Sequence, residues 1–139
     1  MSCYAVIDTN VLLSALLSKK PDSATVQVMD AVFDGRIVPL WHKDILAEYE
    51  DVLSREKFHL SPATIKGVLR HIERYGISLS PQPSGVEFID PDDVIFYEVV
   101  MAKRSEDEAW LVTGNLRHFP AKSFIVTPAE MMEILNNGQ

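Results

Sequence analysis

Short apolar runs alternate with helical patterns along this chain, and this alternation restricts its fold more than any other feature. Apolar runs typical of buried strands lie at residues 4–7, 37–40, 110–113 and 124–126. Helical patterns lie between and after them, at residues 10–17, 24–33, 43–53, 62–75, 93–102 and 128–135. Strands that alternate with helices pair in parallel and are covered on both faces. We therefore predict an α/β fold with a mostly parallel sheet.

Several helix ends carry recognisable signals. Ser23 is suited to cap the helix at 24–33, and Gly35 to end it. Ser61 followed by Pro62 predicts a helix start, and Gly76 predicts its end. Thr127–Glu130 has the residues of a capping box with proline at the first helical position. Residues 81–91, rich in proline, are expected to form a loop across the top or edge of the sheet.

Length and composition limit the class of protein. A chain of 139 residues favours a single domain over residues 1–139. The net charge of −7 argues against a basic nucleic-acid coat protein, but a nuclease built on carboxylates remains compatible with it. No signal peptide or run of ~20 apolar residues is visible, so we expect a cytoplasmic protein without a membrane segment. The lone cysteine, Cys3, is expected to be a buried, inert strand residue.

Asp8 directly follows the first predicted strand and precedes a helix. Ligand sites of parallel sheets form at the carboxyl ends of strands, which makes Asp8 a candidate metal ligand. Aspartate is also a preferred helix cap, and position alone favours that simpler role.

Two further acidic groups are candidates. Glu48 and Glu50 lie on opposite borders of the apolar arc of helix 43–53, so helical periodicity does not choose between them. The segment Asp90-Pro91-Asp92-Asp93 places three acids within four residues at a helix start. A helix N-terminus favours acids, but three are more than a cap requires, and a cation would relieve their repulsion.

The segment Leu111-Val112-Thr113-Gly114-Asn115 is a strand end followed by a tight turn. Asn115 suits such a turn, because asparagine tolerates left-handed backbone, but it could equally donate a hydrogen bond to a ligand. His118 is by default an exposed loop residue.

Taken together, the segments Val6–Leu12, Ile45–Tyr49, Asp90–Phe96 and Leu111–Pro120 resemble the PIN-domain family, in particular prokaryotic toxins of toxin–antitoxin pairs. The resemblance spans nearly the whole chain. It implies a three-layer α/β/α PIN-like fold with a mostly parallel central sheet of about five strands. It also implies that Asp8, Glu48 and Asp93 are the metal-binding and catalytic acids, with Thr9, Asn10 and Thr113 orienting them.

The sequence departs from the family pattern in the last segment. Where the family has a fourth acid, this chain has Asn115 and His118. We retain Asn115 as a fourth catalytic candidate that orders a water or holds a carboxylate.

Three carboxylates without a histidine or cysteine cluster form an all-oxygen site suited to Mg²⁺ or Mn²⁺. The expected activity is a metal-dependent endoribonuclease that hydrolyses RNA phosphodiesters. Lys66, Arg70 and Arg74 form a basic stripe on one helix, and Arg117 lies near the expected site; these four residues are candidates for RNA binding, although such a stripe is commonly only a solvated helix face. The resemblance further implies a protein antitoxin and a homodimer.

The main alternative is a weak or inactive PIN domain that binds RNA or protein. A receiver domain and a haloacid-dehalogenase-like phosphatase also place an aspartate after the first strand, but neither motif matches here. A dinucleotide-binding domain is excluded, because no glycine-rich loop follows the first strand.

Overall fold

A computed structural model describes residues 2–138, which contain one sheet with the strand order β3-β2-β1-β4-β5. All neighbouring strands in this described part of the chain pair in parallel. The strands are β1 (Cys3–Ile7), β2 (Ile37–Trp41), β3 (Ile77–Ser78), β4 (Ala109–Val112) and β5 (Ile125–Val126). The mostly parallel central sheet of about five strands that the family resemblance implied is therefore confirmed.

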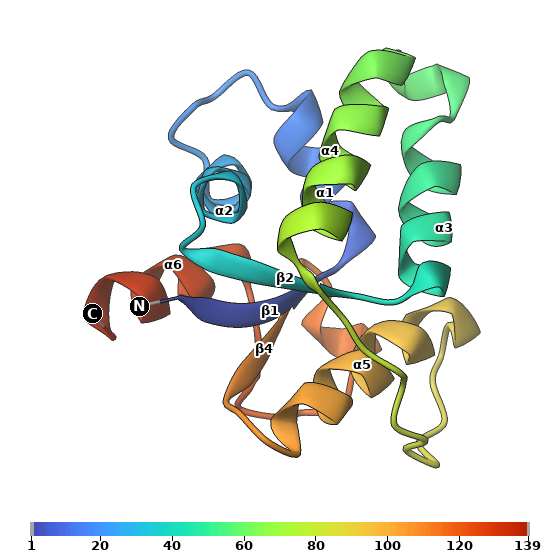
Figure 1. The fold of residues 1–139 in the computed structure, drawn as a ribbon, viewed down its shortest axis with the longest axis vertical. Helices are drawn as coiled ribbons and strands as arrows, with labels where there is room; N and C mark the ends of the chain where they lie inside the picture. The colour runs from blue at the N-terminus through green and yellow to red at the C-terminus, as the bar shows by residue number, and fades with distance from the viewer. Residues whose placement is uncertain (1, 139) are drawn as a thin grey trace.

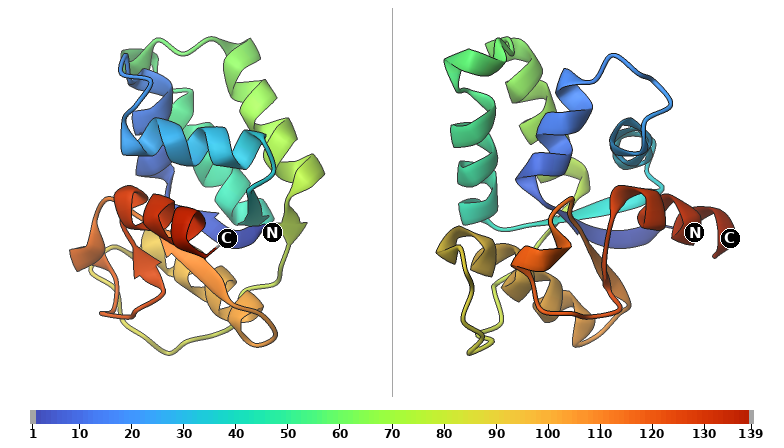
Figure 2. Two further views of the ribbon diagram at one scale, coloured as in Figure 1. Left: turned by 90° about the vertical axis from the view of Figure 1, so that its left-hand side faces the viewer. Right: turned by 180° about the vertical axis from the view of Figure 1, so that it is seen from behind.

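Helices cover both faces of this sheet, as the three-layer prediction requires. The helices are α1 (Thr9–Leu17), α2 (Ala24–Phe33), α3 (Lys43–Leu53), α4 (Pro62–Tyr75), α5 (Val94–Arg104) and α6 (Pro128–Asn137). Helices α1 to α4 lie on one side of the sheet and α5 lies on the other (Figure 1). Helix α6 packs against α2, as the views from the side and from behind also show (Figure 2).

The helix-end signals act as the sequence indicates. Ser23 and Ser61 each accept a backbone hydrogen bond from the first turn of the helix they precede. Thr127 and Glu130 form the complete capping box. Gly35 has a φ of +89°, a left-handed conformation that glycine adopts without strain.

Several element ends differ from the prediction by one or two residues, and three differences bear on the site or the sheet. Strand β3 was not located, because two residues are too short to show a pattern. Strand β4 ends at Val112, so Thr113 lies just beyond the strand. The helix expected from residue 93 begins at Val94, because Pro91–Asp93 form the separate 3₁₀ turn η2, which Asp90 caps through the N–H of Asp92.

The proline-rich loop precedes α5 in the chain and lies along this helix. The N–H of Gln82 donates to the carbonyl of Glu98, and both the N–H and the hydroxyl of Ser84 donate to the Glu98 carboxylate at 3.0 Å. Phe88 packs on the ring of Tyr97. These contacts place the loop beside the helix, where Figure 1 shows it.

The core is centred on β1, in which Ala5, Val6 and Ile7 are buried between the two helical layers. The hydroxyl of Tyr49 donates to the carbonyl of Ile7 and so joins the middle of α3 to the end of β1. Among the described residues, none of the helices is long and apolar enough to cross a membrane.

Two glycines, one inside α4 and one directly after its last residue, give a test of this packing. A Cβ at Gly76, the C-cap, would lie 2.3 Å from the carbonyl oxygen of Pro39 in β2, whereas a Cβ at Gly67, inside the helix, meets no atom within 4 Å. We expect Gly76→Ala to lower the free energy of unfolding by about 2 kcal/mol or more through overpacking. Gly67→Ala should raise it by roughly 0.5–1 kcal/mol, because alanine favours helix. Urea unfolding measures both, and equal effects would contradict this account.

Candidate functional site

The strand order creates a switch point beside β1, because the chain adds β2 and β3 on one side and β4 and β5 on the other. Ligand sites of parallel sheets form at such points, outside the carboxyl ends of the strands. Asp8 follows β1 and Thr113 follows β4 at this position. The N–H of Asp8 donates to the carbonyl of Val112 at 2.9 Å, and the hydroxyl of Thr113 donates to Oδ2 of Asp8 at 2.7 Å. The two strand ends thus hold one carboxylate between them.

Asp8 occupies the N-cap position of α1, but its side chain makes no capping hydrogen bond. The residue is 5% exposed. Burial raises the pKa of the Asp8 carboxyl, while the Thr113 hydroxyl and the nearby N–H groups of Thr9 and Asn10 oppose that rise. Asp8 is therefore aimed at the switch point and does not serve as a side-chain cap.

The packing of α3 decides between Glu48 and Glu50. Tyr49 is buried against the end of β1, and this contact sets the rotation of the helix. Glu48 and Val52, one turn apart on the same face, line the pocket that contains Asp8. Glu50 lies on the other border and lines a separate hollow beside Lys66 and Leu69 of α4. The structure therefore places Glu48 and not Glu50 near Asp8.

The three acids of segment 90–93 have different roles. Oδ1 of Asp90 accepts the N–H of Asp92 at 3.0 Å and caps η2. Asp92 is exposed at the rim of the pocket. The Asp93 side chain is 14% exposed, and its buried Oδ2 makes no hydrogen bond. Asp93 is therefore the member of the segment that the fold turns inward.

These residues line one pocket of about 310 Å³. Its lining comes from the end of β1, from α1 and α3 and from the segment that opens α5, so the pocket lies at the carboxyl edge of the sheet. Figure 1 shows α1 and α3 on one face of the sheet and α5 on the other. The acids that line the pocket are Asp8, Glu48, Asp51, Asp90, Asp92 and Asp93. Two cationic or potentially cationic side chains, Arg55 and His118, also line it, and Arg55 pairs with Asp51 at 3.2 Å.

Burial and mutual repulsion disfavour the charges in this pocket. Burial, followed by the charges of Asp8 and Asp90, raises the pKa of Asp93 to about 6. Burial, followed by the charges of Asp92 and Asp51, raises the pKa of Glu48. A bound cation would favour all of these ionised carboxylates.

The family-implied metal fits this donor set. Asp8, Glu48 and Asp93 supply carboxylate oxygens, which suit Mg²⁺ or Mn²⁺, and the buried Oδ2 of Asp93 accepts no hydrogen bond that a metal ion would have to replace. Within residues 2–138, no three acidic, histidine or cysteine side chains are already close enough together to hold an ion. Binding would therefore draw carboxylates closer together against their repulsion.

Sequence reasoning missed His118 as a residue of the pocket. Its Nδ1 lies 3.4 Å from Oδ2 of Asp93, a charge contact without hydrogen-bond geometry. The only signal in the sequence was that residue 118 is one of the two positions at which the family has a fourth acid. The other position, Asn115, is not among the residues that line the pocket; its N–H donates to the Thr113 hydroxyl at 3.0 Å. A catalytic role for Asn115 stays a prediction.

The remaining predicted residues are distributed unevenly around the pocket. Thr9 and Asn10 line it, and the buried hydroxyl of Thr9 has no hydrogen-bond partner within residues 2–138. Lys66, Arg70 and Arg74 are exposed on α4 and do not line the pocket. Arg117 borders a neighbouring groove.

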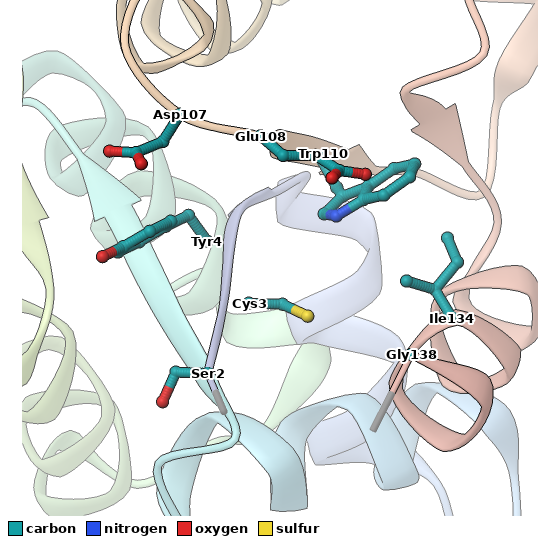
Figure 3. A pocket seen from close by; sticks show the side chains of 8 residues that line it. All are labelled: Ser2, Cys3, Tyr4, Asp107, Glu108, Trp110, Ile134 and Gly138. Atoms are coloured by element: carbon teal, nitrogen blue, oxygen red, sulfur yellow. The ribbon is translucent and has the colours of Figure 1, made fainter.

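A second hollow, of about 280 Å³, includes the start of β1 and lies away from the carboxyl ends of the strands (Figure 3). Cys3 is only half buried there, contrary to expectation, but burial and then Glu108 raise the pKa of its thiol. Asp107 and Glu108 point in different directions, and Asp107 pairs with Lys103 at 3.0 Å. This hollow therefore does not gather ionised groups as the acidic pocket does.

The bond between Thr113 and Asp8 can be tested by an almost isosteric change. Thr113→Val removes the hydroxyl that donates to a buried carboxylate, and we expect the free energy of unfolding at pH 7 to fall by about 1.5–3 kcal/mol. Urea unfolding measures the loss. In an Asp8→Asn background, Thr113→Val should lower the free energy of unfolding by less, because residue 8 then carries no negative charge. Equal losses in the two backgrounds would contradict a charge-dependent bond.

The raised pKa of Asp93 predicts how stability depends on pH. A carboxyl group whose pKa is higher in the folded protein holds its proton more tightly when folded, so its contribution to stability is lost as the pH rises from about 4 through about 6. In the presence of EDTA, the Asp93→Asn variant should therefore be as stable against unfolding as the wild type near pH 4. At pH 7.5, also in EDTA, the variant should be more stable than the wild type. Thermal unfolding at a series of pH values measures this difference, and a difference independent of pH would refute it. Adding Mg²⁺ at pH 7.5 should stabilise the wild type more than Asp93→Asn.

Comparison with known proteins identifies a family for this chain. A family model for the PIN domain matches residues 4–117, a range that includes Asp8, Glu48 and Asp93. No curated protein and no solved structure matches the chain. Because the family match covers most of the chain, this protein belongs to the PIN-domain family.

Proposed function

We propose that this protein is a metal-dependent endoribonuclease. PIN domains are generally nucleases and generally use divalent metal ions, which is the coarse assignment that family membership carries. The single observation that favours activity in this chain is the acidic pocket at the switch point. Asp8, Glu48 and Asp93 come from three separate elements and line that one pocket. A buried structural carboxylate normally accepts hydrogen bonds, whereas Oδ2 of Asp93 accepts none and has only its charge contact with His118.

In this proposal Asp8, Glu48 and Asp93 hold Mg²⁺ or Mn²⁺. When bound, such an ion lowers the pKa of a coordinated water and stabilises negative charge on the phosphate under attack. Thr113 holds the Asp8 carboxylate in one orientation through its 2.7 Å hydrogen bond. Asn10 and His118 lie at the same pocket, where they can contact a phosphate oxygen.

The family resemblance further suggests a toxin of a toxin–antitoxin pair. An acidic pocket is a target for a basic partner, so we propose that an antitoxin occludes it with an arginine or lysine. A homodimer and RNA contacts through Lys66, Arg70, Arg74 and Arg117 belong to the same proposal. The exposed positions of these cations are compatible with it.

One observation favours a second candidate function, that of a binding module with weak or no catalysis. The family's fourth acid is absent, and His118 contacts Asp93 where another carboxylate would add a ligand. A pocket with fewer acids binds a second metal ion less readily. In this second function the protein would bind RNA or a protein partner without hydrolysing RNA.

A matched pair on α3 tests the nuclease proposal. Glu48→Gln should lower Mn²⁺- or Mg²⁺-dependent RNA cleavage by about 100-fold or more, because the carboxylate that it removes is a proposed metal ligand. Glu50→Gln makes the same chemical change two residues away and should leave cleavage within about twofold. Cleavage of a labelled single-stranded RNA, with and without EDTA, measures both.

Asp8→Asn and Asp93→Asn complete the series and should be as inactive as Glu48→Gln. Wild-type protein that binds RNA but does not cleave it with either metal would favour the binding module. Cleavage that survives both Asp8→Asn and Glu48→Gln would exclude this pocket as its source.

A further inference from the structure

A groove of about 560 Å³ lies immediately next to the acidic pocket, and its charge is of the opposite sign. It is built by the 3₁₀ turn η3 (Leu116–His118) and the segment that leads from it to β5. The side chains of Leu116, Arg117 and Phe119 line the groove, whereas His118 between them lines the acidic pocket. One short turn therefore separates the two hollows.

The groove combines an apolar floor with cations. Phe119 and Ile125 are buried and supply the floor, and Phe119 is held edge-on against Phe88. Leu116 is 42% exposed at the border. Arg117 and Lys122 are exposed, and neither has a carboxylate within 4.0 Å in the described part of the chain. None of the described residues that line the groove is acidic.

This combination matches the chemistry of an unpaired nucleotide. A base is flat and apolar on its faces and binds to apolar or aromatic surfaces, whereas its phosphate binds to arginine and lysine. A base paired in a duplex is stacked between its neighbours and does not present a face to such a groove. A protein with a net charge of −7 also needs local cations to hold a polyanion near a pocket of six acids.

We propose that this groove binds a nucleotide of single-stranded RNA next to the phosphate held at the acidic pocket. The inference rests on the proposed function for the identity of the ligand. Arg117 and Lys122 bind the backbone, and the floor of Phe119 and Ile125, with Leu116 at its border, accepts the base. The strand is thereby positioned across η3, and the groove confers a preference for unpaired RNA.

The test is the affinity for a fluorescent 12-nucleotide unstructured RNA, measured by anisotropy in the Asp8→Asn background with Mg²⁺ so that the probe stays intact. Arg117→Gln combined with Lys122→Gln should weaken binding about tenfold or more. The slope of log affinity against log salt should fall by roughly 1.4, because each phosphate contact on a single strand contributes about 0.7. Lys19→Gln combined with Lys20→Gln removes the same charge from the exposed loop after α1 and should change affinity by less than about twofold.

A duplex of the same sequence tests the base-binding part. The groove double variant should reduce single-strand binding much more than duplex binding. An equal loss for duplex and single strand, or an equal loss for the groove and loop variants, would overturn the proposal. The proposal would also be overturned if the groove variant kept its full affinity for RNA while a variant with glutamine at Lys66, Arg70 and Arg74 lost it completely.

Because binding is measured without cleavage, the two proposals can fail independently. A groove that binds as described in a protein that never cleaves RNA would refute only the nuclease assignment. A protein that cleaves RNA but whose groove variant binds normally would refute only the groove.

Discussion

The burial of the Asp8 carboxylate at the end of β1 is the constraint on which the rest of the site depends. The charge of a buried aspartate must be compensated, and the hydroxyl of Thr113 at the end of β4 provides a charge-assisted hydrogen bond. That bond requires β1 and β4 to be neighbours in the correct register, which the pairing of Ile7 with Val112 provides. The sheet topology and the position of the acid therefore depend on each other.

The same burial makes the site unfavourable when no cation is present. Six acids line one pocket, and both burial and repulsion hold the pKa of Asp93 near 6. Such a cluster lowers the stability of the folded protein at neutral pH and is relieved by a bound cation or by a basic partner. In the proposed function, metal binding and occlusion by a basic partner would both act on these same carboxylates.

The short turn η3 separates a cluster of acidic side chains from a pair of basic ones. On one side is the acidic pocket, and on the other is the groove with Arg117 and Lys122. An overall net charge of −7 conceals this arrangement, which only local geometry reveals. His118 links the two hollows, because it belongs to the turn that forms the groove and contacts Asp93 in the pocket.

The sequence by itself determined the class of fold and most element boundaries, because apolar periodicity, capping residues and terminal glycines act locally. It also placed Asp8 after a strand and Asp93 at a helix start. Helical periodicity could not choose between Glu48 and Glu50, which the sequence separated only through the family resemblance. In the folded protein the packing of Tyr49 against Ile7 sets the rotation of α3 and so places Glu48 at the pocket. Only the tertiary structure brought His118 to Asp93, 25 residues away in the chain, and left Asn115 outside the lining of the pocket. Such contacts depend on how separate elements pack, and no local pattern records them.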